Sequence, residues 1–131
     1  MAQANGTFEV KLEPQHPSDQ AQAVKLGRMT IDKQFAGDLA ASSAGEMLAA
    51  MSGVEGSAGY VALERVTGTL HGRHGSFFLQ HSGLMARGVQ QLEITVVPDS
   101  GTEELAGLAG RMAIIIEGGE HRYEFTYTLP A

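Results

Sequence analysis

The chain is a succession of short segments in which apolar and polar residues alternate, and this pattern limits its fold more than any other feature. The clearest instance lies within 59–85, where two alternating runs, 60–70 and 76–85, flank a glycine-rich turn at 71–75. A period of two residues is typical of a β-strand, because successive side chains point to opposite faces. Two such runs joined by a tight turn predict a β-hairpin.

Alternating segments recur along the whole chain. They are separated by turn signals such as Gly37-Asp38, the Pro-Asp-Ser-Gly sequence at 98–101, and Gly118-Gly119. The eight predicted strands are 7–14, 26–35, 39–51, 60–70, 76–85, 91–97, 111–117 and 121–129.

Segment 39–51 is the ambiguous one. Its Ala, Leu, Met and Glu residues favour a helix, but Ser42, Ser43 and Gly45 weaken that helix, and the segment also alternates as a strand. In the context of a barrel we interpret it as a long strand of small residues. Segment 102–110 is too short and too rich in glycine for a long helix, so it predicts one short helical turn near 102–109.

Eight strands in hairpin succession predict an all-β fold, a closed eight-stranded antiparallel barrel. No long amphipathic helix is available to cover an open sheet, and closure removes both the raw edges and the bare apolar face. A barrel of this size is either filled by side chains or holds one small ligand. The length of 131 residues and the absence of a linker indicate a single β-barrel domain over 1–131.

Composition excludes several classes of protein. The chain has no cysteine, so thiol redox chemistry, cysteine-bound zinc and disulfides are excluded. A net charge of -6 with scattered basic residues argues against nucleic acid as a partner. The N-terminus does not resemble a signal peptide, and no run approaches ~20 apolar residues, so we expect a cytoplasmic protein without a membrane segment.

Two pairs of adjacent polar residues lie in the middle of predicted strands. Glu64 and Arg65 are neighbours in one strand, and Gln80 and His81 are neighbours in the next. Within each pair the side chains point to opposite faces, so one member of each should face the interior of the barrel. The sequence leaves open which member that is.

The first pair allows three interpretations. The favoured one is structural, with the inward charge paired, for instance Arg65 with Glu46. The second is a desolvated Glu64 with a raised pKa that acts as an acid or base. The third is a set of surface salt bridges that contribute little to stability.

Other polar residues have weaker signals. His81 among aromatic residues is more typical of a hydrogen-bonded core or interface residue than of a catalyst. Gln80 cannot titrate but can orient a ligand, and Tyr60 is expected in the barrel wall with its hydroxyl at the rim.

No motif for a cofactor or metal is present. His71 and His74 flank the turn, but zinc needs three or four converging ligands, so we expect neither metal nor cofactor. The nucleophile elbow and the phosphate-binding glycine motifs are also missing.

The hairpin sequence GYVALERVTGTLHGRHGSFFLQHSG resembles an uncharacterised family of small bacterial proteins, domain of unknown function three-two-two-four (DUF3224). The segments RMTIDKQFAGDLAASSAGEML, VVPDSGTEELAGLAG and YEFTYTL carry the same resemblance, in order, over essentially the whole chain. That family is similar in fold to the allene oxide cyclase barrel of plants. The segment GTEELAGLAG is similar to the glycine-punctuated turn of that barrel and of dirigent proteins.

The resemblance implies a barrel that forms homo-oligomers, dimers or trimers, and holds a hydrophobic, unsaturated small molecule. It assigns no roles, but it marks six polar residues as typical of the family: Glu46, Tyr60, Glu64, Arg65, Gln80 and His81.

The combined expectation is a barrel that binds a small, largely apolar molecule in its cavity, oriented by Tyr60, Glu64 and Gln80. One alternative is an isomerase or cyclase that acts on a hydrophobic unsaturated molecule through shape and preorganised electrostatics. The other is a filled barrel that serves as an oligomeric interaction module. The sequence leaves open whether the protein is an enzyme.

Overall fold

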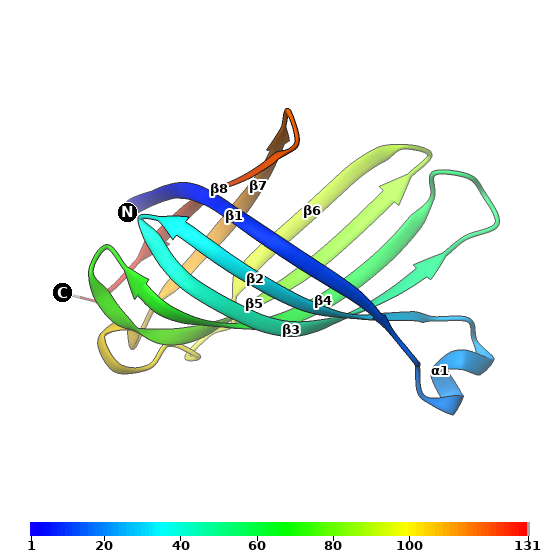
Figure 1. The fold of residues 1–131 in the computed structure, drawn as a ribbon, viewed down its shortest axis with the longest axis horizontal. Coiled ribbons are helices and arrows are strands. Elements are labelled where there is room, and N and C mark those ends of the chain that lie inside the picture. Colours follow the sequence, from blue (N-terminus) through cyan, green and yellow to red (C-terminus); the bar gives the residue numbers. More distant parts are fainter. Residues whose placement is uncertain (131) are drawn as a thin grey trace.

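Eight strands follow one another in chain order around a closed antiparallel barrel in the computed structural model, which describes residues 1–130 (Figure 1). The barrel closes where the first strand pairs with the last. All eight predicted strands form, so the predicted fold class is confirmed. The strands are β1 (Ala2–Gln15), β2 (Gly27–Gly37), β3 (Leu39–Met51), β4 (Ala58–Leu70), β5 (Arg73–Ala86), β6 (Val89–Val96), β7 (Ala109–Glu117) and β8 (Glu120–Thr128).

The ambiguous segment 39–51 is a strand. β3 pairs with β2 over 41–49 and with β4 along its whole length. Since local propensity was nearly balanced, hydrogen bonding to two neighbouring strands decides the outcome. The interpretation as a long strand is confirmed.

Two connections differ in detail from the sequence prediction, and a third agrees with it. The segment between the first two predicted strands contains a short helix, α1 (Asp19–Ala23), whose first turn is capped by Ser18 Oγ accepting from Ala21 N at 3.2 Å. The turn expected over 71–75 is tighter, since β5 already begins at Arg73. The predicted helical turn is confirmed as η1 (Glu103–Leu105). In the part of the chain that the structure describes, no helix has the length and apolar character needed to cross a membrane.

One end of the barrel, the closed end, is filled by apolar side chains. Leu105 and Leu108, from the segment around η1, are buried against the barrel interior, and Thr102 Oγ1 accepts from Ser76 N at 3.0 Å. Phe77 stacks on Phe125 with ring centroids 5.8 Å apart. The largest buried side chains of this core are Phe8, Phe35, Leu39, Leu70, Phe77, Leu79, Leu105, Leu108, Tyr123, Phe125 and Tyr127.

Tyr123 fastens the closed end to the turn between β2 and β3. Its hydroxyl accepts from Leu39 N at 2.9 Å and lies 2.9 Å from Ala36 O and 3.1 Å from Leu39 O. A buried phenol with backbone partners on both sides of a turn fixes that turn to the barrel wall.

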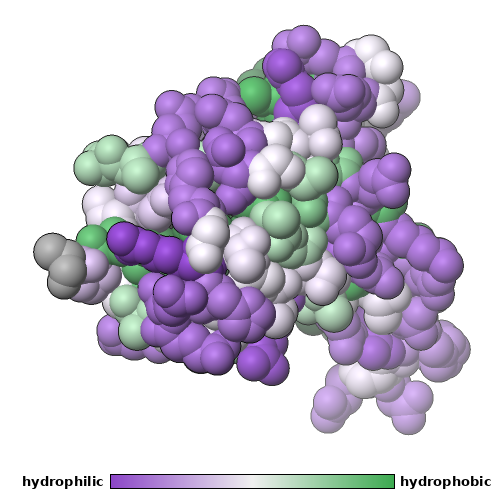
Figure 2. Space-filling view, turned by 60° about the vertical axis from the view of Figure 1, so that its left-hand side comes forward, coloured by the Kyte–Doolittle hydropathy of each residue, from purple (hydrophilic) through white to green (hydrophobic). Residues whose placement is uncertain are grey.

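The walls separate at the other end, the open end. β1 pairs with β8 only over 2–8, and the described residues of β6 and β7 share the single pair Thr95–Arg111. Figure 1 shows the strands spreading apart from the closed end toward this one. Most of the face in Figure 2 is hydrophilic, with hydrophobic residues gathered near its centre, as expected for a barrel with polar outer positions.

Candidate functional site

The six polar residues singled out in the sequence divide equally between the inside and the outside of the barrel. Glu64 and His81 are buried, with 1% and 4% of their surface exposed, and Tyr60 is half-buried. The inward residues are Tyr60, Glu64 and His81, and the outward residues are Glu46, Arg65 and Gln80. Strand alternation therefore separates each adjacent pair as expected, and it is Glu64 and His81 that face inward.

The carboxylate of Glu64 is the centre of a buried polar cluster. It accepts from Lys33 Nζ at 2.9 Å, from Ser43 Oγ at 2.7 Å and from His81 Nε2. The four residues come from β2, β3, β4 and β5, which are neighbours in the barrel. Lys33, Ser43, Glu64 and His81 are called the central cluster below.

Small residues of β3 make this cluster possible. β3 lies between Lys33 on β2 and Glu64 on β4, and it places Ser43 opposite Lys33 and Gly45 opposite Glu64. A Cβ atom at Gly45 would lie 2.0 Å from Leu63 O and 2.6 Å from Glu64 Cα. The absence of a side chain at Gly45 therefore allows the close approach of β3 and β4 at Glu64.

The environment of Glu64 holds its carboxyl group ionised. Burial by itself raises the pKa of Glu64, but the bonds from His81, Lys33 and Ser43 outweigh burial and lower that pKa to about 2. The interpretation of Glu64 as an acid or base with a raised pKa is therefore wrong. Its two oxygens accept three hydrogen bonds, and it acts on the other members of the cluster as a fixed negative charge.

Lys33 connects the central cluster to the aromatic core of the closed end. Its ammonium lies 5.1 Å from the ring centroid of Phe8 and 5.8 Å from that of Phe35. The faces of both rings and the Glu64 carboxylate stabilise this buried cation. Sequence reasoning missed Lys33, although it shares the strand parity of Ile31 and Phe35.

Tyr60 continues the central cluster toward the open end. Its hydroxyl lies 3.4 Å from His81 Nδ1, the ring nitrogen that does not face Glu64. Burial, followed by the negative charge of Glu64, raises the pKa of Tyr60, so the phenol keeps its proton. Gly83 lies opposite Tyr60, and a Cβ there would come within 2.2 Å of Tyr60 Cε1. The Tyr60 ring can therefore occupy this position only because Gly83 has no side chain.

A pocket of about 360 Å³ opens beyond Tyr60, between the ends of β3 and β5 and the starts of β4 and β6. We call it the mouth pocket. Its walls are mostly apolar, and its main side chains are Met47, Met51, Tyr60, Met85, Gln90 and Leu92. Methionine side chains are flexible and polarisable, so such walls adapt to ligands of different shape.

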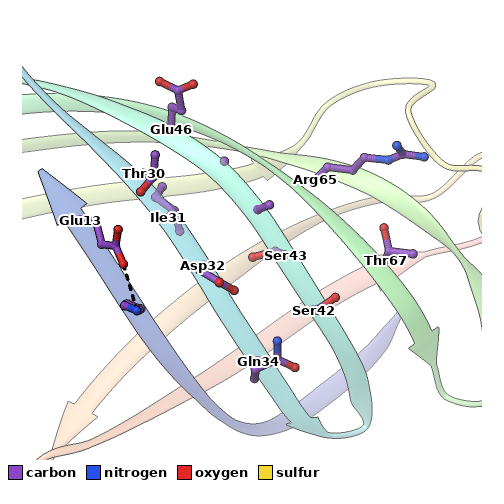
Figure 3. Close-up of a pocket in the computed structure, with 13 residues that line it drawn as sticks. Glu13, Thr30, Ile31, Asp32, Gln34, Ser42, Ser43, Glu46, Arg65 and Thr67 are labelled. Carbon is purple, nitrogen blue, oxygen red and sulfur yellow. Dashed lines mark ion pairs between the residues drawn. The ribbon is translucent and has the colours of Figure 1, made fainter. Parts of the chain in front are cut away.

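The outward candidates line two grooves on the outer surface instead. Glu46 and Arg65 contribute to a polar groove of about 700 Å³ over β1 to β4, shown in Figure 3. Glu46 forms its ion pair with Arg28, and the Arg65 guanidinium lies 3.4 Å from Ser76 Oγ. The predicted pairing of Arg65 with Glu46 is therefore wrong, because Glu46 on β3 has its partner on β2 and Arg65 on β4 has its partner on β5.

Gln80 lies in a second, more apolar groove of about 810 Å³ beside α1. We call it the outer apolar groove, and Leu48, Val61 and Leu63 supply its exposed apolar surface. Gln80 is therefore not positioned to orient a molecule inside the barrel.

The turn histidines lie at the closed end, away from the mouth pocket. His71 Nδ1 contacts the Tyr127 hydroxyl, and His74 Nε2 lies 3.6 Å from Glu103. Within residues 1–130, no group of three or more His, Asp or Glu side chains is arranged to hold a metal ion.

Comparisons with known proteins confirm the family resemblance. The model of a family described as "Protein of unknown function (DUF3224)" matches residues 4–127. A solved structure of a DUF3224 family protein of unknown function, from Shewanella oneidensis MR-1, is 53% identical with a TM-score of 0.92. The match covers 100% of this chain and 99% of that one. No curated protein matches the chain.

Proposed function

This chain belongs to the DUF3224 family of proteins of unknown function, and we propose that it binds a small, largely apolar molecule in the mouth pocket. The observation that carries the proposal is a mostly apolar pocket at the open end with Tyr60 in its wall, whose hydroxyl lies 3.4 Å from His81 Nδ1. Pockets for small molecules typically combine apolar walls with a few polar groups that fix orientation. A volume of about 360 Å³ lies at the lower end of their usual range.

The charges of the central cluster favour an uncharged ligand. Glu64 is balanced by Lys33, and the carboxylate is also bonded to Ser43 and His81. A charged group that entered the pocket would lose its water without finding an unpaired opposite charge. An uncharged apolar molecule would instead cover Met51 and Leu92, which are 77% and 44% exposed, and contribute about 25 cal/mol per Å² of buried apolar area.

The experiment is a titration with the uncharged fluorescent probe N-phenyl-1-naphthylamine, whose emission rises in an apolar site. Met47→Gln places an amide in the wall of the mouth pocket and is expected to weaken binding several-fold. Leu63→Ser, in the outer apolar groove, is the matched control and is expected to leave binding unchanged. Loss of binding in Leu63→Ser with normal binding in Met47→Gln would move the site to the outer groove and contradict the proposal.

An isomerase or cyclase in the same pocket is the second candidate. The observation that favours it is the chain of side chains from the Glu64 carboxylate through the His81 imidazole to the Tyr60 phenol. A proton transferred to or from a substrate would then pass through Tyr60, since Tyr60 lines the mouth pocket and Glu64 does not. Turnover of an uncharged unsaturated substrate that disappears in Tyr60→Phe, with substrate binding retained, would support this candidate.

Three expectations accompany the proposal. The barrel is similar in fold to allene oxide cyclase, the protein resides in the cytoplasm, and it forms a dimer or trimer. Each remains a prediction. Light scattering of the purified protein measures the mass in solution, and a monomer at micromolar concentration would remove the last of the three.

A further inference from the structure

We propose that the ligand of the mouth pocket carries a hydroxyl group, which donates a hydrogen bond to Tyr60 while Tyr60 donates its own proton to His81. This inference rests on the proposed function and names the chemical class of its ligand: an uncharged, mostly apolar alcohol, phenol or enol. It rests on which group donates and which accepts in each hydrogen bond between the central cluster and the pocket.

The direction begins at Glu64. An ionised carboxylate only accepts hydrogen bonds, so each group that contacts it must donate. His81 reaches Glu64 through Nε2, so that nitrogen carries a proton. In the neutral ring the other nitrogen, Nδ1, is then an acceptor.

The direction continues to Tyr60. Its hydroxyl is the polar group within reach of His81 Nδ1, at 3.4 Å. A phenol has one proton, and once that proton is donated to Nδ1 the oxygen of Tyr60 can only accept. Tyr60 lines the mouth pocket, and the structure gives its hydroxyl one side-chain partner, His81, so a lone pair of the oxygen is left to accept from a ligand.

A ligand with a hydroxyl group therefore fits better than an ether or ketone of the same shape. The hydroxyl extends the series from ligand to Tyr60, His81 and Glu64, and hydrogen bonds in such a series polarise one another. An ether oxygen offers only lone pairs to an oxygen that has already committed its proton. It would have to draw the Tyr60 proton away from His81 and leave Nδ1 without a donor.

The test compares two probes of nearly the same shape, 1-naphthol and 1-methoxynaphthalene, with the wild-type protein and Tyr60→Phe. We expect the wild type to bind 1-naphthol more tightly than 1-methoxynaphthalene. We expect this preference to be about 3- to 10-fold smaller in Tyr60→Phe, which is the range of a typical single hydrogen bond. Binding of 1-methoxynaphthalene is expected to change little. Circular dichroism of both proteins checks that the variant folds.

The outcomes separate this inference from the proposed function. If both probes bind in the mouth pocket and their ratio is the same with and without the Tyr60 hydroxyl, the inference is overturned and the proposed function stands. If neither probe binds there, both are overturned.

A second measurement addresses the direction of the bonds without a ligand. The ¹⁵N NMR shifts of the His81 ring report which nitrogen carries a proton, and we expect a proton on Nε2 and none on Nδ1. A proton on Nδ1 would reverse the hydrogen bond to Tyr60 and overturn the inference.

Discussion

The closed and open ends of the barrel are built from the same eight strands but filled in opposite ways. At the closed end, aromatic and branched apolar side chains pack together, and Leu105 and Leu108 complete the core. At the open end, the inward positions hold the half-exposed Met47 and Met85 and the exposed Met51, and β6 and β7 separate beyond Thr95 and Arg111. The difference shows that this small barrel concentrates its apolar packing at one end and keeps an open, partly exposed pocket at the other.

The central cluster lies between the two ends and belongs to both. Lys33 contacts the aromatic rings of the closed end, and His81 contacts Tyr60 at the mouth pocket. Buried charges are tolerated only when every polar group has a partner. No buried side-chain nitrogen or oxygen among residues 1–130 lacks one.

The largest expected effect comes from breaking the central cluster itself. Glu64→Leu leaves the ammonium of Lys33 buried without its counter-charge, and we expect it to lower the free energy of unfolding by about 3–5 kcal/mol, measured by urea denaturation. Arg65→Leu, next in sequence but on the outer face, is the control and should change stability by less than about 0.5 kcal/mol.

The double variant Lys33→Met with Glu64→Leu tests the reason for that loss. It removes both charges and should recover most of the lost stability. If Glu64→Leu alone left stability unchanged, Lys33 and Glu64 would not form the buried pair that joins the two ends.

Acid should produce a smaller loss through the same carboxylate. The pKa of Glu64 is lowered from 4.5 to about 2 in the folded protein, so the unfolded chain takes up this proton first as the pH falls. Its contribution to stability is fully present above about pH 4.5 and is lost as the pH falls toward 2, in total on the order of 3 kcal/mol. Urea midpoints across this range should fall more steeply for the wild type than for the Lys33→Met, Glu64→Leu double variant. Equal slopes would show that Glu64 keeps an ordinary pKa.

A tyrosine-to-phenylalanine substitution at each end compares the effects of the two ends on stability and on probe binding. Tyr123→Phe, at the closed end, removes the acceptor for Leu39 N and should lower the free energy of unfolding by about 1–3 kcal/mol without altering probe binding. Tyr60→Phe, at the open end, removes one long hydrogen bond and should cost less than about 1 kcal/mol. Urea denaturation and probe titration of both variants give the result, and a larger stability loss in Tyr60→Phe would reverse the assignment of the two ends.

The smallest effect on stability is expected at the rim of the mouth pocket. Met51 is 77% exposed, so Met51→Ser should change the free energy of unfolding by no more than about 0.5 kcal/mol. The same change removes apolar surface from the wall of the pocket and should weaken probe binding about 2- to 5-fold. A thermal unfolding scan and a probe titration check the two expectations. Unchanged probe affinity would remove Met51 from the site.

The sequence predicted the barrel because alternation is a local property that each strand carries in its own residues. It also placed Glu64 and Arg65 on opposite faces, for the same reason. It could not say which of them faces inward, because that depends on the direction in which the whole sheet curls. The choice between an isolated Glu64 with a raised pKa and a paired one likewise depended on partners outside its own strand.

The role of Lys33 could not be predicted from the residues of its own strand. Its parity with Ile31 and Phe35 indicates an inward position, but an inward lysine makes sense only with an anionic partner. That partner, Glu64, lies two strands away across β3, and the two meet because β3 carries Ser43 and Gly45 between them. A contact between non-adjacent strands leaves no periodic signal in the sequence.

The central claim is that the closed end of the barrel is filled and that a ligand binds at the open end. Its most direct test uses the methyl groups of the six methionines as NMR probes. With ¹³C-methyl-labelled protein and increasing 1-naphthol, we predict that the signals of Met47, Met51 and Met85 shift together with one dissociation constant. Met112, buried in the core of the closed end, should not move. Saturable shifts at Met112 with none at the mouth pocket, or no shift at any methionine at millimolar probe, would contradict the account.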